Sequence, residues 1–190
     1  MSMVTARACG GTAVLRRRKL LPPSVTLAAL LEGGSDAAFR ALVQDILVMA
    51  KELQELRAAL ARALGVSEPQ YRVVLAVAQL ARTAGAGVSQ VADYLRVSGA
   101  FVTMETRSLV RRGLVAKHAD PLDGRAVLLS LTKKGRRSLA RLAAHQQAVN
   151  NELSRDFSAA EFHRLSGFGR RLVANAERAR RASAALARGD

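Results

Sequence analysis

The chain has 190 residues, of which 49% are hydrophobic and 24% charged, and this balance excludes a disordered chain. Its formal net charge of +15 is high for this length and favours a polyanionic partner, either a nucleic acid or an anionic membrane surface. Aromatic residues make up only 4% and tryptophan is absent, which argues against binding of RNA or single strands by base stacking.

The sequence predicts neither a membrane span nor an exported protein. No apolar run reaches the ~18 residues that a transmembrane helix needs. Arg16–Leu21 has the charge pattern that opens an export signal, but Pro22-Pro23 interrupts it and no small-residue cleavage site follows. The single cysteine, Cys9, excludes an intrachain disulfide and a CxxC site. We therefore expect a cytoplasmic protein without a membrane partner.

The first 66 residues are predicted to be an arm followed by a long helix. Residues 1–34 mix Arg, Gly and Pro without a period, and we interpret them as a flexible basic arm with a short helix at Val25–Glu32. Residues 35–66 begin with a capping residue, Ser35 or Asp36, and are predicted to form one dimerisation helix from about Asp36 to Leu64. Its apolar residues recur every three or four positions, as Phe39, Leu42, Val43, Ile46, Met49, Leu53, Leu56, Leu60 and Ala63. A small domain cannot cover so long a stripe, so part of it is expected to meet another helix or another subunit.

Residues 67–131 are predicted to form a winged helix-turn-helix. The expected elements are helices at Glu68–Arg82, Ser89–Leu95 and Gly99–Arg112, then strands at Leu114–Lys117 and Ala126–Leu131, with Thr83–Gly87 as a loop. The turn between the strands reads Asp120-Pro-Leu-Asp-Gly-Arg125. Since a helix with a free polar face fits the major groove, this order of elements is typical of a protein that docks on duplex DNA.

Residues 132–190 are predicted to be C-terminal dimerisation helices. Thr132 caps a helix that reaches about Arg155, and Ser158-Ala-Ala-Glu161 is a capping box for a last helix at about Ala159–Ala185. The predicted fold class is therefore mainly α with a small β-hairpin wing, a winged helix-turn-helix domain flanked by N- and C-terminal dimerisation helices.

Four motifs with the spacing of this domain resemble the MarR family of winged-helix transcription regulators. They are Ser89-Gln-Val-Ala-Asp-Tyr-Leu95, Leu109-Val-Arg-Arg-Gly-Leu-Val115, Asp120-Pro-Leu-Asp-Gly-Arg125 and Leu129-Ser-Leu-Thr-Lys-Lys-Gly135. The resemblance extends from about Asp36 to Ala182, and it implies a cytoplasmic homodimer that binds pseudo-palindromic duplex DNA. In many relatives a small phenolic or aromatic acid between the dimer helices and the DNA lobe releases the DNA, and others sense oxidants through cysteine.

The chain departs from that family pattern at two places. Met104 and Glu105 stand where the family often has a basic and then an apolar residue, and Gly124 stands where relatives often have a second basic residue in the wing. The preferred DNA sequence can therefore not be inferred from relatives.

The candidate DNA contacts lie on the second helix of the motif and at the wing tip. On the helix they are Ser98, Gly99, Ala100, Thr103, Met104 and Arg107, and in the wing Asp123 and Arg125. The N-terminal part of such a helix faces base edges, and its amides suit a phosphate. Thr103 offers a hydroxyl to a base or phosphate and a methyl group to thymine. Arg125 can enter the minor groove, while Asp123 orients it or closes the turn.

Several of these candidates have a simpler structural interpretation. Ser98 can be an N-cap, and Arg107 can pair with Glu105, which we expect to form a local ion pair. Arg125 can be a solvated wing residue. Four apolar residues are predicted to pack against the neighbouring helix, namely Phe101, Val102, Leu109 and Val110. Six cations are interpreted as phosphate contacts or as sources of a general positive field, namely Arg111, Arg112, Lys117, Lys133, Lys134 and Arg136.

No enzymatic, metal or cofactor site is predicted. The three histidines His118, His145 and His163 lack ligand spacing, and no nucleophile can be joined to a base and an orienting group. No effector-binding residue is assigned. The expected function is a homodimeric transcription regulator, in the first place a repressor, that binds double-stranded DNA and responds to a small aromatic or phenolic effector. A non-specific architectural DNA-binding protein and a protein-interaction adaptor on the same fold are the alternatives.

Overall fold

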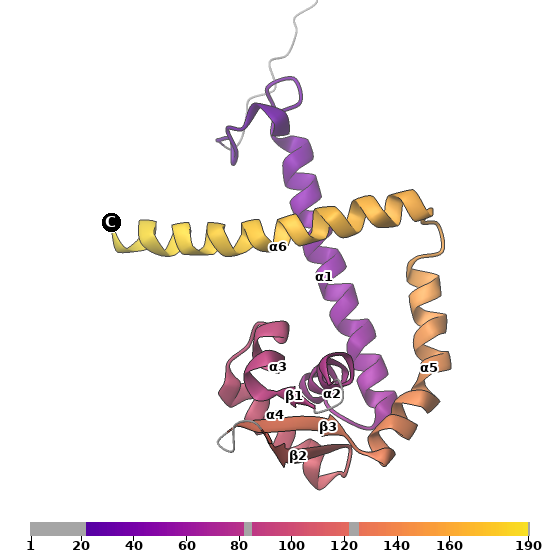
Figure 1. The fold of residues 1–190 in the computed structure, drawn as a ribbon. Helices are drawn as coiled ribbons and strands as arrows, with labels where there is room; N and C mark the ends of the chain where they lie inside the picture. The colour runs from indigo at the N-terminus through magenta and orange to yellow at the C-terminus, as the bar shows by residue number, and fades with distance from the viewer. Residues whose placement is uncertain (1–21, 82–84, 122–125, 190) are drawn as a thin grey trace, which may run out of the picture. The chain divides into compact units, whose positions relative to one another are not determined.

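The computed structural model describes residues 22–81, 85–121 and 126–189. The elements in these ranges are the 3₁₀ turn η1 (Ala28–Leu30), α1 (Ala37–Leu64), α2 (Glu68–Leu80), β1 (Ala86–Gly87), α3 (Val88–Leu95), α4 (Gly99–Arg111), β2 (Val115–Ala119), β3 (Val127–Leu131), α5 (Lys133–Leu153) and α6 (Ala159–Arg188). They are drawn in Figure 1. The described part is mainly helical with a small wing sheet, which confirms the predicted fold class. It divides into two compact units between Leu53 and Gln54.

The wing sheet has one strand more than the sequence predicted. Its antiparallel strands are ordered β1-β3-β2, and β1 lies in the segment that we expected to be a loop. Ala86 pairs with Leu129 and Gly87 with Leu128, and the side chain of Ala86 is fully buried. A strand of two residues is too short to show a periodicity of two, so the sequence pattern carries no signal for it.

The helix starts follow the capping residues identified in the sequence. The Ser67 side chain accepts a hydrogen bond from the Gln70 amide, and the Gln70 side chain accepts one from the Ser67 amide, each at 3.3 Å. Ser158 and Glu161 form the second capping box, and Thr132 accepts from the Gly135 amide at 2.9 Å. Hydrogen bonding to Ser158 lowers the pKa of Glu161. Short-range signals therefore fix where α2, α5 and α6 begin.

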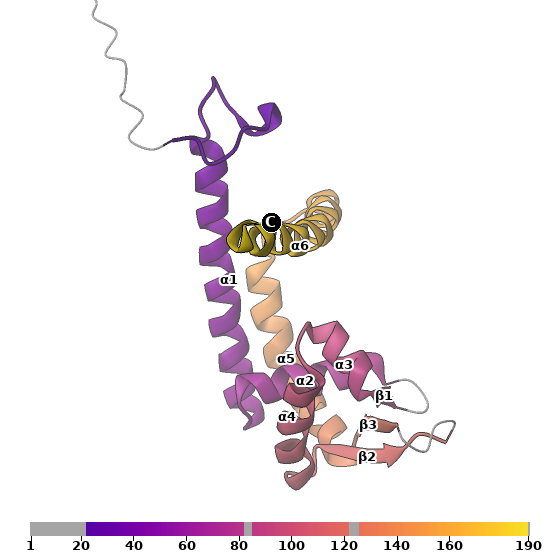
Figure 2. The ribbon, with the colours of Figure 1, turned by 90° about the vertical axis from the view of Figure 1, so that its left-hand side faces the viewer.

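The hydrophobic core of the second unit lies between α2, α3, α4 and the sheet, which Figure 2 shows side by side. Its fully buried side chains include Tyr71, Val73, Val74, Val77, Val91, Val102, Thr106, Leu109, Val115 and Leu129. The prediction that Val102 and Leu109 pack inside is confirmed. The same prediction for Val110 is wrong, because 37% of this residue is exposed.

The first turn of α5 is fastened to the segment that joins α4 to β2. The Thr132 hydroxyl donates to the carbonyl of Gly113 at 2.6 Å, and the Thr132 amide donates to the carbonyl of Leu114 at 3.0 Å. Gly135 is buried directly against Leu114, and a Cβ atom at Gly135 would lie 2.1 Å from the Leu114 carbonyl oxygen. Only glycine permits this approach of two backbone segments.

The N-terminal end of α1 is closed by a hydrogen-bonded clasp. Asp36 Oδ2 accepts from the amide of Ser24 at 2.6 Å, from its hydroxyl at 2.7 Å and from Arg40 Nε at 2.9 Å. Arg40 also donates to the carbonyl of Pro22 at 2.6 Å. The Ser24 hydrogen bonds are the main cause that lowers the pKa of Asp36 to about 2. Ionised Asp36 therefore stabilises the clasp at pH values above the ordinary pKa of a carboxyl group. This stabilisation is lost only as the pH falls toward 2.

We expect Gly135→Ala to lower the free energy of unfolding by about 3 kcal/mol, because the added methyl group must push two backbone segments apart. Chemical denaturation monitored by circular dichroism measures this. Gly167→Ala in α6 is the matched control, since nothing lies within 4 Å of the Cβ position there. It should be neutral or stabilising by about 0.5–1 kcal/mol. Equal stability of both variants would contradict the close packing at Gly135.

Candidate nucleic-acid interface

Helix α4 is anchored by one face and leaves the other open. Val102, Thr106 and Leu109 are fully buried on the inner face. Ala100, Met104 and Arg107 are exposed and Thr103 is half-buried. These last four follow the spacing of one helical stripe, which we call the outer stripe of α4. The outer stripe is therefore available for a partner while the opposite face holds the helix in the core.

The turn between α3 and α4 sets the direction of α4. Arg96 takes the left-handed conformation, with φ 56° and ψ 49°, and its amide donates to the carbonyl of Asp93 at 3.2 Å. The Val97 amide donates to the carbonyl of Ala92 at 3.0 Å, and the Arg72 side chain donates to the carbonyl of Leu95 at 3.1 Å. A left-handed residue other than glycine costs about 1–2 kcal/mol, so these bonds must hold the turn in place.

Ser98 serves as the N-cap of α4, as its simpler interpretation predicted. Its side chain accepts from the Phe101 amide at 3.1 Å. Ser98, Gly99 and Ala100 are all exposed, and nothing lies within 4 Å of the Cβ position of Gly99. The start of α4 therefore combines open amides with the positive end of the helix dipole, which suits an anion.

Strands β2 and β3 form the hairpin of the wing. They pair from Val115 opposite Leu131 to Ala119 opposite Val127, and the Asp120 amide donates to Ala126 at 3.0 Å beyond the last pair. His118 and Ser130 are joined across the hairpin by a hydrogen bond of 2.7 Å. The wing candidates Asp123 and Arg125 lie outside the described residues, so their roles remain predictions.

Three cations that the sequence analysis treated as general positive charge are instead bound to backbone carbonyls. The Arg112 side chain donates to the carbonyl of Gly65. The Lys134 side chain donates to the carbonyl of Arg112 at 2.8 Å, and the Arg136 side chain donates to the carbonyl of Leu131 at 2.6 Å. These contacts join α1, α4, β3 and α5 around the winged domain. The sequence alone could not distinguish these structural cations from cations that face a partner.

Three other cations surround one hollow beside α4. Arg107 and Arg111 of α4 and Lys117 of β2 line a cavity of about 490 Å³, with Val110 as the fourth lining residue. All three cations are exposed, and within the described residues none of them forms an ion pair or a hydrogen bond. We call this cavity the α4–β2 hollow. Of its lining residues, only Arg107 was predicted from the sequence to be a specific contact.

Glu105 does not form the predicted ion pair. It is half-buried on α4, and no Lys or Arg of the described residues pairs with it. Its neighbour Arg107 lies two positions away, and residues with this spacing do not face each other on a helix. The carboxylate therefore remains beside the outer stripe as the one negative charge of α4.

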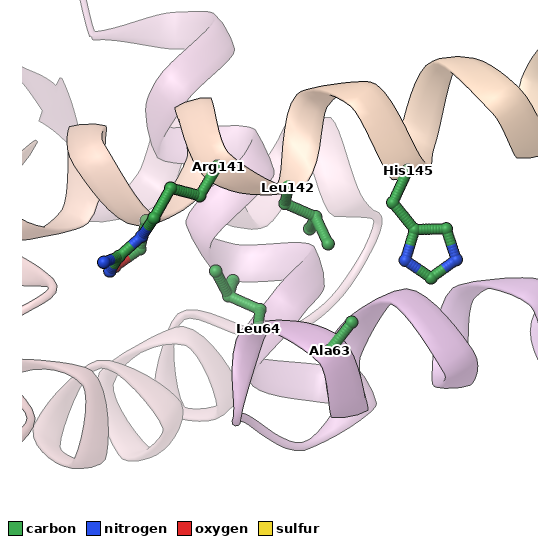
Figure 3. A pocket seen from close by; sticks show the side chains of 6 residues that line it. Ala63, Leu64, Arg141, Leu142 and His145 are labelled. Atoms are coloured by element: carbon green, nitrogen blue, oxygen red, sulfur yellow. The ribbon is translucent and has the colours of Figure 1, made fainter.

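A second cavity, of about 350 Å³, lies between the last turn of α1 and the first half of α5. Ala63, Leu64 and Leu142 supply apolar surface, and Arg141, His145 and Ser138 supply polar groups. Figure 3 shows Leu142 and His145 pointing from α5 toward α1. Arg141 donates to Ser138 at 3.4 Å. Within the described ranges, no group of three His, Cys, Asp or Glu residues could hold a metal ion.

Solved transcription regulators share this fold. The PcaV transcriptional regulator from Streptomyces coelicolor, solved with its natural ligand, is 27% identical, with a TM-score of 0.55 over 67% of this chain and 91% of that one. A probable transcriptional regulator from Pseudomonas aeruginosa is 28% identical, with a TM-score of 0.54 over 69% of this chain and 98% of that one. A MarR transcriptional regulator from Methanosarcina mazei Go1 shows the same fold. It is 17% identical, with a TM-score of 0.58 over 73% of this chain and 98% of that one. No curated protein sequence matches the chain.

The anchored helix α4, its open outer stripe and the adjoining hairpin define a winged helix-turn-helix DNA-binding protein. The model of the MarR family matches residues 64–126, which run from the end of α1 into the wing. Over these residues the chain is similar to the MarR family of transcription regulators, and solved transcription regulators share its fold. None of the helices in the described ranges has the length and apolar character to span a membrane.

Proposed function

We propose that the protein is a homodimeric repressor that binds pseudo-palindromic duplex DNA and releases it when a small aromatic or phenolic acid binds. The observation that carries the DNA-binding part is the division of α4 into a buried face and an exposed outer stripe. A dimer that occupies promoter DNA represses by exclusion alone, without a contact to the transcription machinery.

The proposed homodimer explains why two long helices expose apolar surface. In the first half of α1, Leu42, Val43 and Met49 are 39–48% exposed although they follow the predicted apolar stripe. In α6 no described side chain is buried, and Leu165, Phe168 and Leu172 are 38–49% exposed. Apolar stripes of this length on both helices exceed what a monomer leaves in water, and a second copy of the chain offers the same stripes as partners.

In this proposal each subunit places the outer stripe of α4 in a major groove. Ser98, Gly99 and Ala100 face a phosphate at the helix start, while Thr103, Met104 and Arg107 lie along the groove. Arg125 reaches the adjacent minor groove with the support of Asp123. Two copies related by a two-fold axis then read half-sites about 34 Å apart.

The cavity between α1 and α5 is the proposed effector site. Its apolar walls suit an aromatic ring, and the Arg141 guanidinium and the His145 imidazole suit a carboxylate or a phenolic oxygen. The similar PcaV regulator was solved in complex with its natural ligand, which supports the proposal by similarity. An acid that prefers one spacing of the two DNA-binding lobes would shift the population away from the DNA-bound form.

The function is tested by selecting bound fragments from a random duplex pool. We expect a two-fold symmetric motif bound at least ~10³-fold more tightly than bulk DNA. Thr103→Ala should change the preferred base at one position of each half-site, and cost about 1–3 kcal/mol on the selected site, because its hydroxyl and methyl group face a base. Thr26→Ala, an exposed change far along the sequence, is the control. Binding without any motif would indicate an architectural protein, and no binding at low salt an adaptor.

The dimer is tested by Phe168→Glu, which places a charge in the exposed apolar stripe of α6. If this stripe is covered by a second copy, the dissociation constant measured by sedimentation should rise at least about 100-fold, because burying an unpaired carboxylate is costly. Ala174→Glu, on the opposite side of α6, should leave it unchanged. A wild-type chain that sediments as a monomer at micromolar concentration would rule out the homodimer.

The effector site is tested with a panel of hydroxybenzoates. We expect at least one to weaken binding of the wild-type protein to its selected site. Arg141→Gln should keep the DNA affinity but weaken this response by about 10–100-fold, because a charge-assisted hydrogen bond is worth about 1.5–3 kcal/mol. Arg137→Gln, one turn earlier on α5 and outside the cavity lining, is the control. Identical responses of the two variants would exclude this cavity as the effector site.

A further inference from the structure

We propose that Glu177 of α6 is a positioning residue for DNA binding. Its ion pair with Arg96 fixes the turn between α3 and α4 to α6, and thereby sets the distance between the two α4 helices of a dimer. The inference rests on the proposed function, because it requires a homodimer on two half-sites. It adds a residue that contacts no DNA and acts through Arg96.

The backbone of Arg96 has an unusual conformation. Within the described ranges, Arg96 is the one residue other than glycine that has a positive φ. Glycine adopts this conformation at no steric cost, whereas a residue with a side chain is strained there. The Arg96 side chain is 55% exposed, so burial does not offset the strain. The contact that a glycine could not make is the ion pair with Glu177, and this contact explains an arginine at the strained position.

The carboxylate of the pair, Glu177, has cations close by on its own helix. From Phe162 to Arg188, α6 contains seven arginines and a single carboxylate, that of Glu177. Arg181 lies four positions after Glu177, which is a favourable spacing for an ion pair along one helix. The ion pair that the structure contains nevertheless joins Glu177 to Arg96, a residue outside α6. The carboxylate is therefore directed toward the turn and not along its own helix.

The pair ends at the turn that determines the direction of α4. Arg96 lies two residues before Ser98, the N-cap of α4. Hydrogen bonds hold this turn against α2 and α3, whereas the pair with Glu177 holds it to α6. No described side chain of α6 is buried, so packing within one subunit holds this helix only weakly and a polar contact gains importance. If a second copy covers the apolar stripe of α6, as proposed, each pair links one α4 to the dimer interface.

The strength of the pair limits what it can do. An ion pair between exposed side chains changes an equilibrium by a factor of about 1.5–5. The side chains of Arg96 and Glu177 are 55% and 38% exposed, which places their pair in this class. With one pair in each subunit of a dimer, the factors multiply to about 2–25. Such an effect is too small to decide whether DNA binds, but it is large enough to favour one separation of half-sites over another.

The test measures how binding depends on the separation of the half-sites. The selected duplex is compared with duplexes in which one base pair is added or removed between the half-sites. Glu177→Gln should reduce the preference for the selected separation by about 2–25-fold and leave the affinity for an isolated half-site unchanged, because α4 itself is intact. A merely structural role would weaken binding to all of these duplexes equally. Glu152→Gln is the control, since it removes the carboxylate of a local ion pair with Arg155, and it should keep the wild-type preference.

Two further variants separate the ion pair from a direct contact of Arg96 with DNA. The exchange of charges, Arg96→Glu/Glu177→Arg, should restore most of the preference that Glu177→Gln loses, because the pair then forms in the opposite sense. Arg96→Gly removes the pair without straining the backbone and should lose as much preference as Glu177→Gln. If Arg96 instead binds a phosphate, the exchanged variant stays impaired and Arg96→Gly reduces the slope of log K against log[salt] by about 0.9 for each subunit. That result would overturn the positioning role.

A measurement on the protein alone examines the pair without DNA. The Val97 amide donates to the carbonyl of Ala92 within the turn, so its hydrogen exchange reports opening of the turn. Glu177→Gln should accelerate this exchange by about 1.5–5-fold, and the Glu152→Gln control should not. An unchanged rate in Glu177→Gln would overturn the proposal.

The outcomes separate the positioning role of Glu177 from the function on which it rests. An equal preference for half-site separation in the wild-type protein and in Glu177→Gln, with DNA binding intact, would overturn the positioning role and leave the proposed function standing. A wild-type chain that is monomeric or binds no duplex would overturn both.

Discussion

The contact between two stretches of backbone, at Leu114 and at Gly135, is the constraint on which the winged domain depends. Leu114 follows the end of α4 and precedes β2, and Gly135 lies in the first turn of α5. The Thr132 side chain caps α5 and at the same time donates to the carbonyl of Gly113. One junction thus joins α4, both strands of the hairpin and α5, which leaves the domain. The first turn of α5 is therefore fastened by hydrogen bonds to the end of α4 and to the wing.

The sequence was most informative where structure is determined locally. Ser67, Ser98, Thr132 and Ser158 mark helix starts because a cap needs only residues within one turn, and the structure confirms all four. The two faces of α4 could likewise be predicted, because burial follows helical spacing. The exposure of Val110 could not, because it depends on how β2 passes the end of α4. The strand β1 escaped prediction since its two residues are defined by pairing with β3.

The candidate site was predictable in part for the same reason. Its helical members lie on one stripe, and the sequence placed them on one helix with a regular spacing. Which cations face outward depended on distances between segments far apart in the chain, such as the 47 positions that separate Arg112 from Gly65. The net charge of +15 therefore has two components, one that holds the domain together and one directed outward. Cations of both kinds keep their charge and add to the positive field that attracts a polyanion.

The clasp at Asp36 has a consequence for the motion of α1. A helix normally frays from its first turn, where the amides have no partner within the helix. Here one carboxylate oxygen accepts from three donors and closes a loop between Ser24 and Asp36, which are twelve positions apart. Opening of the first turn must break this loop as a unit, so amide exchange there should be slower than at a bare helix end.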